Sequence, residues 1–391
     1  MKKIVPANRV SDIKEYYFSR KLREIAELNS QGADIISLGI GGPDRPPSEK
    51  VISTLQRESA VETNHSYQSY NGLPELRKAF ADWYKEKYNV TLDYQTEILP
   101  LIGSKEGILH ISLAFLNPGD GVLVPDPGYP TYTSVSKLVG ATIYKYNLTE
   151  ENGWLPDFEE ISKLPLDKIK LMWVNYPHMP TGKQADKNTF EKIIAFGEKN
   201  GIVIAHDNPY SFILNKEPIS ILEIPGAMSV AVEMNSLSKS HNMAGWRVAM
   251  AASNPEFISW IMKVKSNIDS GQFKPVMLAA AEALKLSEDW YDELYAMYEE
   301  RRNIAEEIMK TLDCEFDPCQ RGLFLWGKVP GDIPSGEYLA DELLYKAKVF
   351  VTPGFIFGKN GEKYIRISLC ADKDKLIESL NRIKKYKNER S

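Results

Sequence analysis

The sequence predicts an α/β fold, with a large domain that contains a mostly parallel sheet flanked by helices and a small α+β domain. From residue 74 to about residue 285, short apolar runs of strand type alternate with amphipathic segments of helix length, which is typical of βαβ units. After about residue 285, a long charged helix is followed by mixed strands and helices. We therefore expect a large domain over 46–285 and a small, discontinuous domain from 1–45 and 286–391.

The individual elements follow from the hydrophobic period along the chain. Pro74 opens a helix in which Leu76 and Phe80 lie on one face. Helices are expected over 74–88, 104–116, 157–164, 188–200, 288–312, 338–347 and a basic segment at the end of the chain. Strands are expected over 121–128, 141–146, 170–177, 202–209, 228–239, 246–254, 322–329, 349–354 and 364–370. The first 45 residues contain one clear helix.

The composition of the chain is that of a globular protein. Of 391 residues, 43% are hydrophobic and 26% are charged, which excludes disordered chains and disulfide scaffolds. A formal net charge of −5 argues against nucleic acid and acidic membranes as partners. A chain of this length needs no metal or disulfide to hold its core, and no metal site is expected.

The location of the protein is predicted from three absences in the sequence. The start of the chain has no apolar core of a signal peptide, and no apolar run reaches the ~18 residues that a membrane span needs. Cys314, Cys319 and Cys370 show no CxxC spacing and cannot all pair with one another. This pattern fits a reducing compartment, so we expect a cytoplasmic enzyme.

The strongest chemical signal is the stretch NSLSKSHNMAGWR at 235–247. Ser236 and Ser238 stand two residues apart at the end of an expected strand, so their side chains should point to the same side. Two hydroxyls and the guanidinium of Arg247 suit a phosphate group. Lys239 lies between them and could form an imine with an aldehyde cofactor. A single lysine is most often a solvated surface residue, so a chemical role for Lys239 depends on its combination with the two serines and Arg247.

This stretch resembles the cofactor-lysine motif of the class I/II aminotransferases of fold type I, the pyridoxal-phosphate family related to aspartate aminotransferase. The resemblance covers about residues 35–370 and implies that Lys239 is the catalytic residue and that pyridoxal 5′-phosphate is the cofactor. In HDNPY, Asp207 and Tyr210 match residues that bind the pyridine nitrogen and the ring hydroxyl. An anion at the ring nitrogen keeps it protonated, which the cofactor needs as an electron sink. Taken alone, Asp207 would be interpreted as a turn or helix cap.

Further matches concern the phosphate and the cofactor ring. Gly103, Ser104 and Lys105 resemble the glycine-bearing turn whose N–H groups bind the phosphate, at a helix start that favours an anion. Tyr129 matches the aromatic residue that stacks on the ring. Tyr67 matches the tyrosine that reaches the phosphate of the neighbouring subunit, which implies a homodimer with shared active sites. Without the family, the glycine turn is an ordinary helix cap and Tyr129 an ordinary core tyrosine.

Two matches concern the substrate. Arg366, in the strand YIRIS, matches the arginine that binds the substrate α-carboxylate with two hydrogen bonds. The alternative interpretation of Arg366 is a surface-facing arginine on an edge strand. Gly41, in SLGIGGPD, matches a backbone segment that approaches the same carboxylate. The partners implied are small molecules, an L-amino acid and a 2-oxo acid, with donors of the aspartate, alanine or diaminopimelate type left open.

One departure from the family pattern is Met179, which replaces the asparagine of Asn-Pro-Thr-Gly. In the family this asparagine donates a hydrogen bond to the ring oxygen, which a thioether cannot do. Asn175 and His178 lie nearby and could either replace it or cap the turn. We expect the weaker hydrogen bonding to raise the pKa of the Lys239 imine.

Two other functions remain as alternatives to an aminotransferase. A carbon–sulfur β-lyase would use the same cofactor and scaffold, and its release of ammonia and pyruvate without an acceptor would identify it. A non-catalytic ligand-sensing module would need a DNA-binding segment. The sequence shows neither a basic patch nor an N-terminal stretch long enough for a helix-turn-helix.

Overall fold

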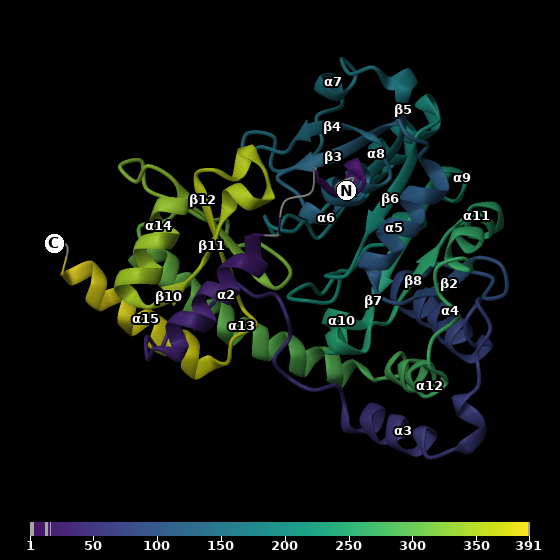
Figure 1. The fold of residues 1–391 in the computed structure, drawn as a ribbon, viewed down its shortest axis with the longest axis horizontal. Coiled ribbons are helices and arrows are strands. Elements are labelled where there is room, and N and C mark those ends of the chain that lie inside the picture. The colour runs from purple at the N-terminus through teal and green to yellow at the C-terminus, as the bar shows by residue number, and fades with distance from the viewer. Residues whose placement is uncertain (1–3, 12–14, 16, 390–391) are drawn as a thin grey trace.

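The computed structural model describes residues 4–11, 15 and 17–389, and it contains a seven-stranded sheet with the order β2-β8-β7-β6-β5-β3-β4 (Figure 1). The strands are β2 (Ile98–Leu101), β3 (Gly121–Asp126), β4 (Thr142–Asn147), β5 (Ile169–Val174), β6 (Val203–Asp207), β7 (Ala231–Ser236) and β8 (Ala249–Ala252). Only β8 runs antiparallel to its neighbours, β2 and β7. The prediction of a mostly parallel sheet is confirmed.

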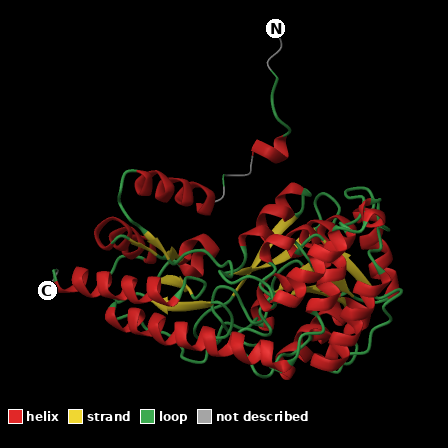
Figure 2. Ribbon diagram, turned by 90° about the horizontal axis from the view of Figure 1, so that it is seen from below, coloured by secondary structure: helices red, strands yellow, loops and turns green. Residues whose placement is uncertain are grey.

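Helices cover both faces of this sheet (Figure 2). One face packs against α5 (Ser104–Phe115), α6 (Pro130–Leu138) and α11 (Pro255–Lys265). The other face packs against α4 (Pro74–Tyr88), α8 (Lys187–Asn200) and α12 (Lys274–Ala283), with α3 (Glu49–Ser59) against α12. In β5, Leu171 and Trp173 belong to the first core, and Met172 and Val174 belong to the second. Strands buried on both faces explain the continuous apolar runs in the sequence.

A smaller unit surrounds the antiparallel sheet β11-β12-β9, on the left in Figure 1. Its strands are β9 (Phe324–Lys328), β11 (Thr352–Pro353) and β12 (Tyr364–Ser368), and its helices are α2 (Tyr17–Ser30), α13 (Glu288–Thr311), α14 (Gly336–Glu342) and α15 (Lys373–Asn388). Near the start of the chain, β1 (Ile36–Ser37) pairs in parallel with β10 (Val349–Phe350). The domain limits at 46 and 285 stay a prediction.

Several expected strands are shorter than their apolar runs. The run at 228–239 is divided into α9 (Ala227–Val230), β7 and α10 (Leu237–Ser240), and β8 begins three residues after position 246. The run at 349–354 is divided between β10 and β11, which belong to different sheets. The helix expected at 338–347 is α14 followed by a π-helical turn over Leu343–Ala347. A buried apolar run does not by itself distinguish strand from helix, which explains these differences.

The remaining α-helices of the described residues are the short helices α1 (Asn8–Ser11) and α7 (Phe158–Ile161), and single 3₁₀ turns lie in several of the loops. Within the described part of the chain, none of the helices has the length and apolar character to cross a membrane. Cys314 and Cys370 are buried, Cys319 is exposed, and all three are free thiols.

Candidate active site

A pocket of about 580 Å³ lies between the large sheet and the small unit. Asp207 is the last residue of β6, Ser236 is the last residue of β7, and α5 begins shortly after β2. These strand ends lie at the same edge of the sheet, the carboxyl edge at which α/β proteins bind ligands. Most of the residues expected at the site line the pocket: Gly41, Ser104, Lys105, Tyr129, Asp207, Tyr210, Ser236, Ser238, Lys239, Arg247 and Arg366.

Hydroxyl groups and a guanidinium gather at one end of the pocket. The hydroxyls of Ser236 and Ser238 are 2.9 Å apart, and Arg247 Nη1 is 3.5 Å from the Ser238 hydroxyl. The buried Ser104 hydroxyl has no hydrogen-bond partner among the residues that the structure describes. Gly103 does not line the pocket, but a Cβ there would lie 1.9 Å from Arg247 Nη2, so this glycine lets the guanidinium approach the start of α5. This end of the pocket therefore offers donors to an anion.

The two serines come together for a different reason from the one that the sequence suggested. Ser236 is the last residue of β7 and caps α10, while Ser238 lies in the first turn of α10. The Ser236 hydroxyl accepts a hydrogen bond from the Ser238 N–H at 3.2 Å. The prediction of a common side was right, but the cause is a capped helix start and not the alternation of a strand.

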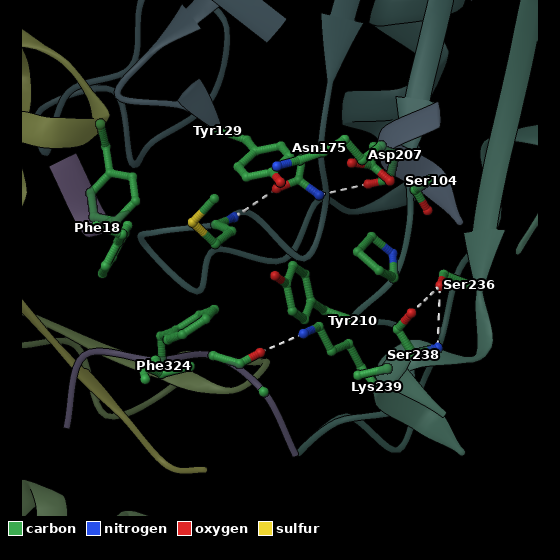
Figure 3. Close-up of a pocket in the computed structure, with 18 of the residues that line it drawn as sticks. Phe18, Ser104, Tyr129, Asn175, Asp207, Tyr210, Ser236, Ser238, Lys239 and Phe324 are labelled. Carbon is green, nitrogen blue, oxygen red and sulfur yellow. Dashed lines mark hydrogen bonds between the residues drawn. The ribbon is translucent and has the colours of Figure 1, made fainter. Parts of the chain in front are cut away.

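Asp207 is a buried carboxylate that faces the pocket (Figure 3). Its Oδ2 accepts a hydrogen bond from the Tyr132 hydroxyl at 2.9 Å, and its Oδ1 has no partner within the described residues. Burial raises the pKa of Asp207 to about 6, while the Tyr132 hydrogen bond and the charge of His206 act in the opposite direction. Tyr132 was not predicted from the sequence; it lies in α6, three residues after Tyr129, which is the N-cap of that helix.

Lys239 lies in α10, and its side chain points into the middle of the pocket (Figure 3). Its Nζ donates a hydrogen bond to the backbone oxygen of Gly41. Removal from water lowers the pKa of Lys239, and the positive charges of Arg366 and Arg247 lower it further, against an opposing effect of Cys370. A lowered pKa favours the neutral amine, which is the nucleophilic and basic form.

Arg366 is 4% exposed, so it is not a surface arginine. Its Nη2 donates to Gly39 O at 2.9 Å, and its guanidinium carbon lies 3.7 Å from the ring centre of Phe324 and 4.7 Å from that of Phe357. Phe18 and Phe324 lie on the opposite side of the pocket from Ser104, Ser236 and Ser238 (Figure 3). The pocket thus has an aromatic end around one guanidinium and a polar end.

Met179 is buried beside this arginine, with its sulfur 3.2 Å from Arg366 Nη1. Asn175 lines the pocket, but its Oδ1 accepts from the Met179 N–H at 2.8 Å and its Nδ2 donates to Asp207 O at 2.6 Å. The imidazole of His178 lies 2.8 Å from the Thr181 hydroxyl, and burial lowers its pKa to about 3. Asn175 and His178 are therefore engaged in holding the turn at 175–181.

Tyr67 and Tyr129 have different positions relative to the pocket. Tyr67 is 92% exposed and does not line the pocket of its own chain. Tyr129 does line it, with its ring edge against Tyr132 at 5.6 Å and Lys105 Nζ 6.0 Å from its ring centre. The roles expected for these two tyrosines stay predictions.

A family model described as aminotransferase class I and II matches residues 33–383. The chain belongs to this family. The aminotransferase is 43% identical over 382 residues to an LL-diaminopimelate aminotransferase of Maridesulfovibrio salexigens. The aligned residues cover 97% of this chain and 98% of the relative. It is 41% identical over 383 residues to a protein of the same name from Aquifex aeolicus, with 97% and 99% covered.

A solved structure of BacF from Bacillus subtilis with bound substrate shares the fold of this aminotransferase. The TM-score is 0.94 at 34% identity, with 98% of each chain covered. The predicted fold class and the predicted enzyme class are confirmed.

Proposed function

We propose that this aminotransferase binds pyridoxal 5′-phosphate at Lys239 and transfers an amino group from LL-diaminopimelate to a 2-oxo acid. The observation that carries the cofactor assignment is the carboxylate of Asp207, whose buried Oδ1 faces the pocket without a partner in the described chain. Such an acceptor requires a donor, and a protonated pyridine nitrogen is a donor of the right charge. The donor substrate is proposed from the relatives that are named for it.

The other end of the pocket also fits this cofactor. The Ser104 hydroxyl is buried without a partner in the part of the chain described, and Ser238 and Arg247, which lie side by side, line the same pocket. We assign the phosphate to these groups and to Ser236, because charge-assisted hydrogen bonds are the strongest that such a site can make. Lys105 is proposed to contribute from the same turn.

The cofactor, when bound, supplies an aldehyde and an electron-withdrawing ring on which an amino group can be exchanged. Asp207 would accept the hydrogen bond of the ring nitrogen, while Tyr132 donates to its Oδ2 and holds the carboxylate in place. Tyr210 is assigned to the ring hydroxyl, and Tyr129 is assigned to the ring face. Neither Asn175 nor His178 is proposed to replace the family's asparagine.

Lys239 has two roles in this proposal. Its Nζ would hold the cofactor through its amine, and as a free amine the same Nζ would act as the base that accepts the proton of the substrate α-carbon. The lowered pKa of Lys239 suits the second role, because a neutral amine accepts a proton. Arg366 and the backbone at Gly41 orient the substrate by its α-carboxylate, so that the α-hydrogen faces Lys239.

The test is a donor panel with the purified holoenzyme. LL-diaminopimelate, aspartate and alanine are each supplied with 2-oxoglutarate, and the glutamate formed is measured. We expect the highest kcat/KM with LL-diaminopimelate, loss of all transfer in Lys239→Ala, and normal transfer in the control Lys192→Ala on α8. Transfer by Lys239→Ala would refute the assignment of the lysine. A higher kcat/KM with aspartate or alanine would refute the donor.

Tyr67 supports a second part of the proposal, which concerns assembly and location. We propose a homodimer in which Tyr67 of each chain reaches the phosphate of the other, because the side chain is exposed and does not line the pocket of its own chain. Sedimentation should give a dimer, and Tyr67→Phe should weaken cofactor binding without dissociating the dimer.

We also propose a cytoplasmic location from the three free thiols, which fractionation of cells would test.

A further inference from the structure

Asp126, the last residue of β3, is a buried carboxylate that accepts hydrogen bonds from the small unit. Its Oδ2 accepts from the Lys359 N–H at 3.2 Å, and its Oδ1 accepts from the Asn360 N–H at 3.0 Å. Both donors lie in a 3₁₀ turn (Lys359–Gly361) between β11 and β12. Asp126 therefore joins the carboxyl edge of the large sheet to a loop of the small unit.

Asn360 completes the contact from the side of the small unit. Its Nδ2 donates to the backbone oxygen of Asp126 at 2.9 Å and to Oδ1 of Asn147, the last residue of β4, at 3.0 Å. The side chain of Asp126 is thus bonded to the backbone of Asn360, and the side chain of Asn360 is bonded to the backbone of Asp126. This reciprocal pair holds the two backbones at a defined separation.

The two segments approach so closely that a glycine is required between them. Gly358 has φ 146°, and a Cβ at this position would lie 2.1 Å from Asp126 Oδ1. A side chain there would have to displace the carboxylate. On the other side of this glycine, Phe357 O accepts a hydrogen bond from the Gly128 N–H at 2.8 Å. The contact therefore includes all four residues from Phe357 to Asn360.

Phe357 connects this contact to the candidate substrate site. It lines the pocket, and its ring centre lies 4.7 Å from the guanidinium carbon of Arg366 and 6.0 Å from the ring centre of Trp326. An aromatic ring beside a guanidinium attracts it electrostatically and limits the directions that its donors can take. A displacement of the loop at 357–360 would therefore change the orientation of Arg366.

The large-sheet side of the contact also leads to the pocket. Asp126 and Gly128 belong to the turn that precedes Tyr129, which lines the pocket. One turn thus connects the residue assigned to the face of the cofactor ring with the loop that carries Phe357.

We propose that Asp126 and Asn360 are positioning residues for the substrate, because they hold the loop at 357–360 against the large sheet and so keep the Arg366 guanidinium in the orientation that binds the α-carboxylate. Neither residue lines the pocket, so both act through Phe357. The proposal rests on the proposed function in assigning the α-carboxylate to Arg366. The hydrogen bonds between Asp126 and the loop do not depend on that assignment.

The first measurement is amide hydrogen exchange in the whole purified protein, followed by mass spectrometry of peptides that contain residues 357–361. In Asp126→Ala we expect the amides of Lys359 and Asn360 to exchange about tenfold faster than in wild type, because they lose their acceptors. Unchanged exchange would overturn the proposal, and this result does not depend on the cofactor.

The matched control for this variant is Asp157→Ala. The Asp157 carboxylate also accepts two backbone N–H groups, those of Glu159 at 2.9 Å and Glu160 at 3.2 Å, but it does so at the start of α7 within the large unit. Its substitution should leave exchange at 357–361 unchanged. Faster exchange there in Asp157→Ala would show that general loosening is the cause and would also overturn the proposal.

The second measurement is a spectral titration of the holoenzyme with 2-aminoisobutyrate and with isopropylamine, two amines that differ only in the α-carboxylate. In Asp126→Ala and in Asn360→Ala we expect the affinity for 2-aminoisobutyrate to fall by about tenfold, while the affinity for isopropylamine stays the same. In steady-state kinetics the loss should lie mainly in KM. A purely structural role would leave both affinities unchanged or would lower both equally.

The two variants also test each other. Asn360 is partly exposed, so its substitution keeps the test valid if Asp126→Ala does not fold. The double variant should lose no more affinity for 2-aminoisobutyrate than the more affected single variant, because both residues serve one contact. Fully additive losses would show that the residues act separately and would refute the proposal.

The outcomes separate this inference from the proposed function. If the wild-type holoenzyme responds to both amines but the variants leave the ratio of the two affinities unchanged, the inference is refuted and the proposed function stands. If the wild-type protein responds to neither amine, the proposed function fails and the substrate role of Asp126 fails with it. The exchange measurement then still decides whether Asp126 holds the loop.

Discussion

The two ends of the pocket are built in different ways. The polar end consists of residues at adjacent strand ends of one sheet, where Asp207 ends β6 and Ser236 ends β7. The aromatic end consists of residues from distant parts of the chain, with Arg366 of β12 beside Phe324 of β9 and Met179 of the loop after β5. The proposed cofactor end therefore depends on one sheet, whereas the proposed substrate end depends on how the small unit packs against that sheet.

The largest effect is expected from a substitution at the polar end, and it should change the chemical step and not the binding of substrate at the aromatic end. Asp207→Asn should lower kcat by about 10³-fold for every donor, because a neutral amide does not hold the ring nitrogen protonated. Steady-state kinetics with several donors would measure this. A loss confined to KM, or to one donor, would contradict the role of Asp207.

Arg366→Lys should have the next largest effect, about 10²-fold in kcat/KM, and the effect should lie mainly in KM. Lysine keeps the charge but loses the planar pair of donors that matches a carboxylate. Amine donors without a carboxylate should be affected little. The control is Arg382→Lys, which alters an arginine on the outer helix α15. An equal loss with amines that lack a carboxylate would contradict the assignment.

The stability of the cofactor-free protein should reveal the cost of the buried Asp207. Its pKa is about 6 in the folded protein against an ordinary value of 3.8, so the folded state binds the proton more strongly than the unfolded state. The free energy of unfolding should therefore decrease as the pH rises from about 4 through 6, in the direction set by linkage. At pH 7, Asp207→Asn should stabilise the cofactor-free protein by up to about 2–3 kcal/mol, the equivalent of two pKa units.

Urea unfolding at pH 4 and pH 7 would test this expectation. The difference between Asp207→Asn and wild type should nearly vanish at pH 4, where the carboxyl group of the folded protein is already neutral. Asp374→Asn, at an exposed position of α15, is the control and should show no such dependence on pH. A stabilisation of equal size at both pH values would show that the charge is not its cause.

The smallest expected effect concerns Met179. Met179→Asn restores a hydrogen-bond donor to the turn. The absorbance of the cofactor attached to Lys239 changes with pH, and the pKa of this change should fall by less than about one unit. A spectral titration of the holoenzyme would measure it. An unchanged or raised pKa would show that position 179 does not reach the ring oxygen, in keeping with the contact between Met179 and Arg366.

Much of the polar end could be predicted because its residues form short motifs. NSLSKSHNMAGWR places the serines, Lys239 and Arg247 within 13 residues, so local structure alone brings them near one another. Tyr132 escaped prediction because its contact with Asp207 joins residues 75 positions apart. Phe324 escaped because an apolar strand residue carries the same signal whether it packs in a core or lines a pocket.

The α/β fold, the family and the chemical types of the residues at the strand ends could be predicted from the chain, because hydrophobic period and motif spacing are local properties. Only the tertiary structure decided that Arg366 is enclosed by aromatic rings, that Asn175 holds its own turn, and that Asp126 is bonded to a loop of the small unit. Those features depend on which distant segments pack together. Burial and charge act across such contacts, so they become defined only when the chain has folded.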